Sequence, residues 1–209
     1  MSDGPQLPAP GHGVIINGPG PQDWIERYEV VVLVTLVALP FAALTMWGLV
    51  RRRRHAGSTT SSAWRKSLAE VGILYGTLPW LWLTMLPAGS GHAVHGSVSL
   101  VPLEDLATMP TYQIAGNLLV FVALGFFGPL RFAVLRSIPR ILALAATCSV
   151  LIEAAQYVLG LGRVSSVDDV LLNTLGAGLA ASVCWVWWRP RPFSGEQRPA
   201  HATASRGLP

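Results

Sequence analysis

Long apolar runs constrain this chain more than any other feature of its sequence. Five segments of about 20 mostly apolar residues are each long enough to cross a hydrocarbon core about 30 Å thick. Hydrophobic side chains make up 51% of the 209 residues and charged ones only 12%, about half the charged share of a typical soluble domain. We therefore expect an all-α integral membrane bundle of about five transmembrane helices. The expected spans are residues 28–50, 67–86, 111–130, 138–159 and 167–188.

These runs divide the chain into four parts. Residues 1–27 are rich in Gly and Pro and lack the basic and apolar regions of a cleavable signal peptide, so we expect a flexible extracytoplasmic tail. Residues 28–110 hold the first two helices, their basic linker and an outer loop without Lys or Arg. Residues 111–188 form a three-helix core, and residues 189–209 a disordered cytoplasmic tail.

The basic residues predict the orientation of the bundle. Of the 15 Lys and Arg residues, 13 follow the first, third or fifth span, including the run Arg51–Arg54. Because short cytoplasmic loops carry the excess of Lys and Arg, we expect the N-terminus outside and the C-terminus in the cytoplasm. Glu70, near the start of the second span, can reach this basic interface. The net charge of +4 is then a consequence of topology, and nucleic acid is not an expected partner.

Polar side chains interrupt the apolar pattern between Ser149 and Gly178. A charge at the centre of a membrane helix costs about 2.5–3.5 kcal/mol on insertion scales, so such groups usually face a bundle interior and mark function. Helical spacing gives them a common face on the fourth and fifth spans, and the alternating directions of the spans bring a residue of the third to the same depth. We expect one patch at the outer end of the bundle, formed by Asn117, Glu153, Gln156, Arg163, Asp168, Asp169 and Asn173.

Two roles are open for the acids of this patch. Arg163 is the base nearest to them in the sequence, so we expect it to pair with at least one of Glu153, Asp168 and Asp169. Alternatively, Asp168 or Asp169 caps the fifth helix, because both follow serines at a predicted helix start. On the same helix, Gly176 and the alanine four residues later predict close packing against a neighbour.

Four segments of this region resemble the VanZ-like family of bacterial membrane proteins, over about residues 101–181. They read NLLVFVALGFFGPL from Asn117, IEAAQ from Ile152, GR at Gly162 and DDVLLNTLGAGLA from Asp168. The resemblance implies a small helical bundle in the bacterial plasma membrane with a cell-envelope role, and its polar positions map onto the patch named above. The founding member is associated with low-level resistance to teicoplanin, and no reaction is established for the family. The stretch VPLEDL (101–106) departs from the family pattern and keeps only Pro102.

Three functions are compatible with this patch. It could bind a lipid-linked wall precursor, a lipid headgroup or a glycopeptide, with Arg163 meeting phosphate or carboxylate. It could instead be the site of an intramembrane enzyme in which Glu153 is the general acid or base. Finally, it could be a structural lock between helices. We expect a non-enzymatic protein with membrane lipids as partners.

No cofactor or metal is expected from the sequence. His92 and His95 lie in a glycine-rich loop without the further ligands of a zinc site. The oxygen ligands of the patch suit Mg²⁺ or Ca²⁺, but Arg163 among them argues against a cation. Both cysteines, Cys148 and Cys184, lie within apolar spans, where a role in packing is expected.

Overall fold

The computed structural model describes residues 21–87, 98–161 and 164–188. The whole of the predicted C-terminal tail, most of the N-terminal tail and part of the outer loop lie outside these ranges. The first helix begins at Pro21 and so includes the end of the region predicted as a tail, residues 1–27. The elements are α1 (Pro21–His55), α2 (Thr60–Thr84), β1 (Val98–Ser99), α3 (Thr111–Val120), α4 (Val122–Arg131), η1 (Ala133–Leu135), α5 (Ile138–Val158), β2 (Ser165–Ser166) and α6 (Val167–Trp188).

The structure confirms an all-α membrane bundle. Within the described residues, four helical segments are long and apolar enough to cross a membrane: Glu29–His55, Thr111–Arg131, Ile138–Val158 and Val167–Trp188. The predicted second span, residues 67–86, does form a helix, but α2 is not among these four. Its leucines are interspersed with Gly, Pro, Tyr and Trp, and Glu70 lies in its first half.

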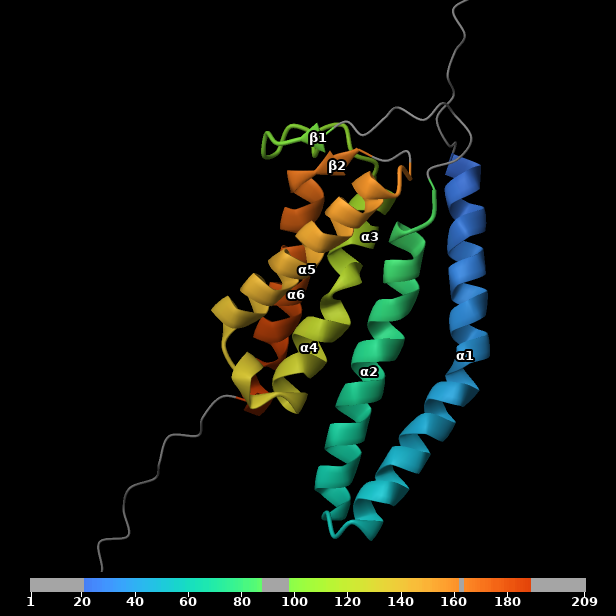
Figure 1. The fold of residues 1–209 in the computed structure, drawn as a ribbon, viewed down its shortest axis with the longest axis vertical. Coiled ribbons are helices and arrows are strands. Elements are labelled where there is room, and N and C mark those ends of the chain that lie inside the picture. Colours follow the sequence, from blue (N-terminus) through green and yellow to red (C-terminus); the bar gives the residue numbers. More distant parts are fainter. Residues whose placement is uncertain (1–20, 88–97, 162–163, 189–209) are drawn as a thin grey trace, which may run out of the picture.

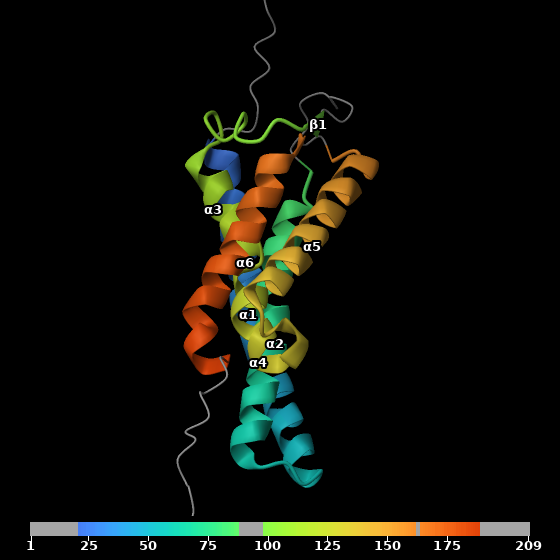
Figure 2. The same cartoon turned by 90° about the vertical axis from the view of Figure 1, so that its left-hand side faces the viewer.

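The helices lie side by side, with α2 between α1 and α4 (Figure 1). On the other side of α4 lies α6, which also packs against α3 and α5. The turn from α1 to α2 lies at one end of the bundle, whereas β1 and the segment after it cross the opposite end (Figure 2). There β1 and β2 form a two-residue parallel pairing, with Val98 opposite Ser165 and Ser99 opposite Ser166. Connections that are distant in the sequence thus meet at one end.

The predicted third span, residues 111–130, is two helices rather than one. The break falls at Phe121, whose φ of −112° and ψ of 14° lie outside the helical region. Helical bonding resumes at once, since the N–H of Gly125 donates to the carbonyl of Phe121 at 2.9 Å. The break therefore separates the upper half of this span, which carries Asn117, from the lower half.

Close backbone contact joins these two half-helices to α6. A Cβ on Gly176 would lie 1.9 Å from the carbonyl oxygen of Leu118, and a Cβ on Gly125 would lie 2.1 Å from that of Ala177. Such distances exclude any side chain, so the glycines allow α3 and α4 to touch α6 directly. The close packing predicted for Gly176 is present. Around it, the buried core consists of Val120, Phe121, Ile141, Ala145, Ala177 and Ala181.

An ion-pair network joins three helices at the basic end. The carboxylate of Glu70 on α2 accepts from Arg53 of α1 and from Arg131 of α4, each at 2.5 Å. Arg53 also donates to the hydroxyl of Ser67, which is fully buried. Glu70 therefore does meet basic residues, as its position in the sequence indicated, and it does so from two helices at once.

Candidate functional site

A buried polar cluster occupies the end of the bundle that carries β1 and β2. We define the polar cluster by eight side chains that are between 0% and 9% exposed. Six of the seven residues predicted for the patch belong to it. The seventh, Arg163, lies outside the described residues. The members are Asn117, Ser149, Glu153, Gln156, Ser166, Asp168, Asp169 and Asn173.

Asp168 joins this cluster to the loop that crosses it. Its side chain is 1% exposed, and its two carboxylate oxygens accept three backbone N–H groups. Oδ1 accepts from Leu103 at 2.6 Å, and Oδ2 accepts from Asp105 at 3.1 Å and from Leu106 at 3.0 Å. Hydrogen bonds to a charged acceptor are roughly twice as strong as neutral ones. We call residues 98–106 the cap, since Asp168 fixes this segment across the end of α6.

Serine, rather than aspartate, caps α6. The hydroxyl of Ser166 accepts from the N–H of Asp168 at 3.1 Å, the bond made by an N-cap residue. The same hydroxyl donates to Asp105 of the cap at 2.6 Å. Asp168 and Asp169 lie in the first turn, where negative charge is favourable. The capping role considered for these acids therefore falls to Ser166.

Glu153 holds the connection that enters α6. Its Oε2 accepts from the N–H of Ser166 at 3.3 Å, and its backbone carbonyl accepts from the hydroxyl of Ser165 at 3.2 Å. The side chain is 9% exposed. Glu153 thus fixes the end of α5 to the start of α6.

The amides of the cluster join further helices. Asn117 of α3 donates to Asp169 of α6, and Asn173 of α6 donates to Ser149 of α5 at 2.7 Å. Gln156 of α5 donates to the carbonyl of Thr84 at the end of α2, at 2.9 Å. The third, fourth and fifth predicted spans therefore do deliver their polar groups to one place.

The cap presents apolar side chains on a strained backbone. Leu103 has a φ of +68°, which is a genuine outlier for a bulky residue. Its side chain is 63% exposed, and those of Leu100 and Val101 are 72% and 58% exposed. Strain of this kind costs about 1–3 kcal/mol and persists only where the surroundings fix the backbone. The bond from the Leu103 N–H to Asp168 supplies such a constraint.

Comparison with known families decides what kind of protein this is. A model of the VanZ/LLP1 family matches residues 73–188. The chain belongs to the VanZ/LLP1 family. The VanZ/LLP1 match covers the second half of α2 through α6, including the whole polar cluster, and it extends the resemblance beyond residues 101–181 at both ends. No curated protein and no solved structure matches the chain.

Sequence reasoning missed part of this candidate site. Asp105 stands in the stretch VPLEDL, which seemed only a departure from the family pattern, and it bonds Ser166. The available signal for Asp105 was that it is an acid in an outer loop that contains no Lys or Arg. The backbone donors at Leu103 and Leu106 have no side-chain signature at all.

The chemistry of this site is that of hydrogen bonding, with carboxylates that accept and with amides and a hydroxyl that donate. Within residues 21–87, 98–161 and 164–188, no group of three or more His, Cys, Asp or Glu side chains could hold a metal ion. Most described contacts of the cluster run between its own members or to the cap and α2. The cluster is therefore suited to fixing the cap, and the surface of the cap is the part that faces outward from the bundle.

Proposed function

We propose that this VanZ/LLP1 protein is a non-enzymatic factor of the bacterial cell envelope that binds a ligand at the outer face of the plasma membrane. The ligand is a lipid-linked wall precursor, a lipid headgroup or a glycopeptide. Binding of a glycopeptide would contribute to teicoplanin-type resistance. In this proposal the basic end of the bundle is cytoplasmic and the cap lies outside.

One observation carries the proposal: a strained cap with exposed apolar side chains is held by a buried carboxylate. Three charge-assisted bonds to Asp168 fix the backbone of residues 103–106. Backbone strain clusters at binding sites and switch regions, where a fixed shape is part of the mechanism. A cap fixed in advance loses less conformational entropy when a ligand binds. Leu100 and Val101, exposed beside it, offer apolar contact at the level of the headgroups.

The polar cluster itself serves as the structural lock in this proposal. The carboxylate of Asp168 already accepts three bonds, and Glu153 accepts from the backbone of Ser166. A general acid or base must instead reach the proton that it transfers. These contacts support a scaffold role for the cluster over an enzymatic role for Glu153. In this proposal the ligand therefore binds at the cap above the cluster.

A matched pair of valines tests the binding role of the cap. Val101→Ser changes the cap, and Val134→Ser changes an equally exposed valine in η1 at the opposite end, the two being 58% and 64% exposed. Both variants and the wild type are expressed in a glycopeptide-susceptible bacterium, and membrane abundance is measured beside susceptibility to teicoplanin. We expect Val101→Ser to lose protection at normal abundance and Val134→Ser to keep it.

Direct binding completes the test. The purified wild-type protein is titrated with teicoplanin, with a fluorescent lipid-linked wall precursor, and with the same lipid tail lacking its headgroup. Binding of a headgroup-bearing ligand that Val101→Ser weakens supports the proposal. Equal binding by wild type and Val101→Ser, or binding of none of the probes, refutes it.

The orientation is tested separately. In a background with Cys148 and Cys184 replaced by alanine, Glu104→Cys and Ser61→Cys place exposed thiols at the cap and at the basic end. A membrane-impermeant maleimide added to intact cells should label only Glu104→Cys. Labelling of Ser61→Cys alone would put the cap in the cytoplasm and refute an outer binding site.

A further inference from the structure

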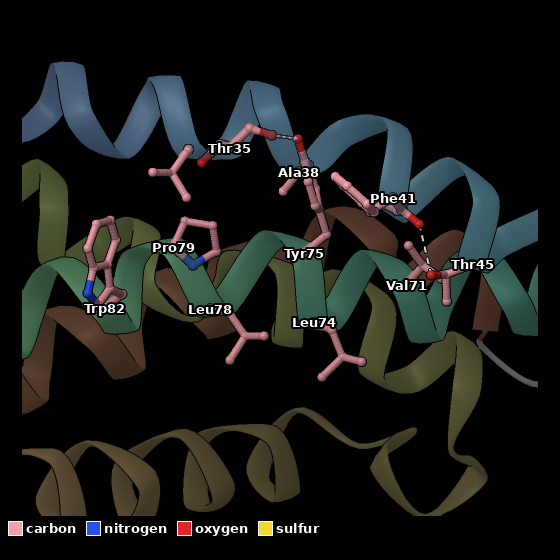
Figure 3. A pocket seen from close by; sticks show the side chains of 12 residues that line it. Thr35, Ala38, Phe41, Thr45, Val71, Leu74, Tyr75, Leu78, Pro79 and Trp82 are labelled. Atoms are coloured by element: carbon pink, nitrogen blue, oxygen red, sulfur yellow. Dashed lines mark hydrogen bonds between the residues drawn. The ribbon is translucent and has the colours of Figure 1, made fainter.

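A pocket of about 420 Å³ lies between α1 and α2 (Figure 3). Its lining is almost entirely apolar, and the hydroxyls in it are used within the protein. That of Tyr75 donates to the carbonyl of Thr35 at 2.5 Å. Those of Thr35 and Thr45 donate to the carbonyls of Val31 and Phe41, at 2.6 Å and 2.8 Å. These three hydroxyls already donate within the protein, so the pocket offers an occupant mainly dispersion contacts. Such a lining suits a hydrocarbon chain.

The pocket lies at membrane depth. On α1 it extends from Val34 to Thr45, inside the apolar segment Glu29–His55. Only 6% of the apolar window of that segment is buried, because within the described part of the chain α2 is the one helix that packs extensively against α1. Figure 1 shows α1 changing direction part-way along, and Pro40 is the proline inside it. The solvent around this pocket is lipid, so its natural occupant is an acyl chain.

Charge at one end of the pocket selects the kind of lipid. Arg52 lies two helical turns beyond Thr45 on the same face of α1, about 10 Å along the axis at 1.5 Å per residue. Trp64 lies two turns before Val71 on the pocket face of α2, and both Arg52 and Trp64 are exposed. Arg53, by contrast, is engaged by Glu70 and Ser67. An exposed arginine and an exposed tryptophan at the same end of the pocket match an anionic headgroup above an acyl chain.

We propose that the α1–α2 pocket binds one acyl chain of an anionic phospholipid from the leaflet at the basic end, with its phosphate at Arg52. The chain enters the pocket near Thr45 and extends toward Val34. The α1 side of the pocket lies outside residues 73–188, which match the family. This lipid site therefore combines α1, outside the matched region, with α2, and it is separate from the cap.

Photo-crosslinking tests this site directly. The full-length protein is placed in phosphatidylcholine nanodiscs with a minor fraction of phosphatidylglycerol that carries a diazirine in the distal half of one acyl chain. After irradiation, adducts are mapped by peptide mass spectrometry. We expect them to concentrate on the pocket faces of α1 and α2. The same photoreactive chain on phosphatidylcholine should give about fivefold fewer adducts there, as expected for one basic contact.

Paired variants separate specific binding from general lipid contact. Ala38→Phe and Ala42→Phe fill the pocket, and Ala43→Phe adds the same ring to an exposed position on the opposite face of α1. Arg52→Gln and Arg54→Gln remove equal charge, the second away from the pocket face. Pocket adducts should fall with Ala38→Phe, Ala42→Phe and Arg52→Gln, and should stay at the wild-type level with the other two.

Three results would overturn the proposal. Adducts spread evenly over the exposed faces of α1, α5 and α6 would mean that the pocket holds no particular chain. Equal yields from both headgroups would remove the role of Arg52. Covalent dimers crosslinked through the pocket would show that a second copy occupies it. Thermal unfolding of every variant confirms that a lost adduct reflects the site and not the fold.

Discussion

Replacing Asp168 by asparagine should open the cap while leaving the helices in place. The substitution keeps the size of the side chain and removes its charge. Only one oxygen remains to accept, so either the N–H of Leu103 or those of Asp105 and Leu106 must face an amide N–H₂ group. The arrangement that keeps the 2.6 Å bond to Leu103 loses the two bonds made by Oδ2.

The expected cost follows from those two bonds. A hydrogen bond to a charged group contributes about 1.5–3 kcal/mol net, and the lower part of this range applies because water can reach the half-buried Asp105 and Leu106. The loss of two such bonds therefore costs about 3–4 kcal/mol in the free energy of closing the cap. At 1.4 kcal/mol per factor of ten, the equilibrium constant for opening the cap rises about 100- to 700-fold.

Hydrogen exchange measures this opening directly. In wild type, the amides of residues 103–106 should exchange slowly. In Asp168→Asn the peptide that contains them should exchange faster, by the same factor as the rise in the equilibrium constant for opening the cap. Peptides from α4 and α5 should be unchanged, and Glu104→Gln, an exposed neighbour, serves as the matched control. Equal exchange of the cap in wild type and Asp168→Asn would refute the argument that Asp168 holds it.

Two further predictions concern the packing and the basic end. Gly176→Ala should lower the unfolding temperature in detergent or prevent accumulation in the membrane, because the added methyl group meets the backbone of Leu118 and overpacking costs about 1–3 kcal/mol or more. The control Gly48→Ala, whose methyl group would have nothing within 4 Å, should be neutral or stabilising. Equal behaviour of the two variants would contradict the close approach of α3 and α6. Glu70→Gln should lower the free energy of unfolding by about 1–3 kcal/mol, since it weakens the bonds to both Arg53 and Arg131. The control Glu104→Gln, at an exposed position, should change it by less than about 0.5 kcal/mol. A similar change for both variants would show that the Glu70 network does not stabilise the fold.

The helices of this protein were largely predictable from sequence because lipid imposes a simple rule. Apolar length gives the spans, and the predicted ends of the fourth and fifth agree closely with α5 and α6. The break at Phe121 was not predictable, since neither glycine nor proline stands at that position. The start of α1 at Pro21 was also missed, because polar residues extend the helix beyond its apolar run.

The site was predictable as a set of residues and much less as a set of contacts. Asn117, Glu153, Gln156, Asp168, Asp169 and Asn173 were identified because buried polar groups are rare in apolar helices. Their partners were harder to foresee. Asp168 bonds backbone N–H groups, which every residue except proline carries, and Gln156 bonds the carbonyl of Thr84. Only the fold shows which backbone groups lie nearby.

The distance in sequence between the cap and its anchor has a consequence for how the protein is made. Leu103, Asp105 and Leu106 precede Asp168 by 65, 63 and 62 residues. At about 5–20 residues per second, a ribosome needs roughly 3–13 s to complete that interval. During this time the nascent loop lacks the carboxylate of Asp168, and Asn117 lacks that of Asp169. A closed cap is therefore a signature of a chain whose α6 has been synthesised and inserted.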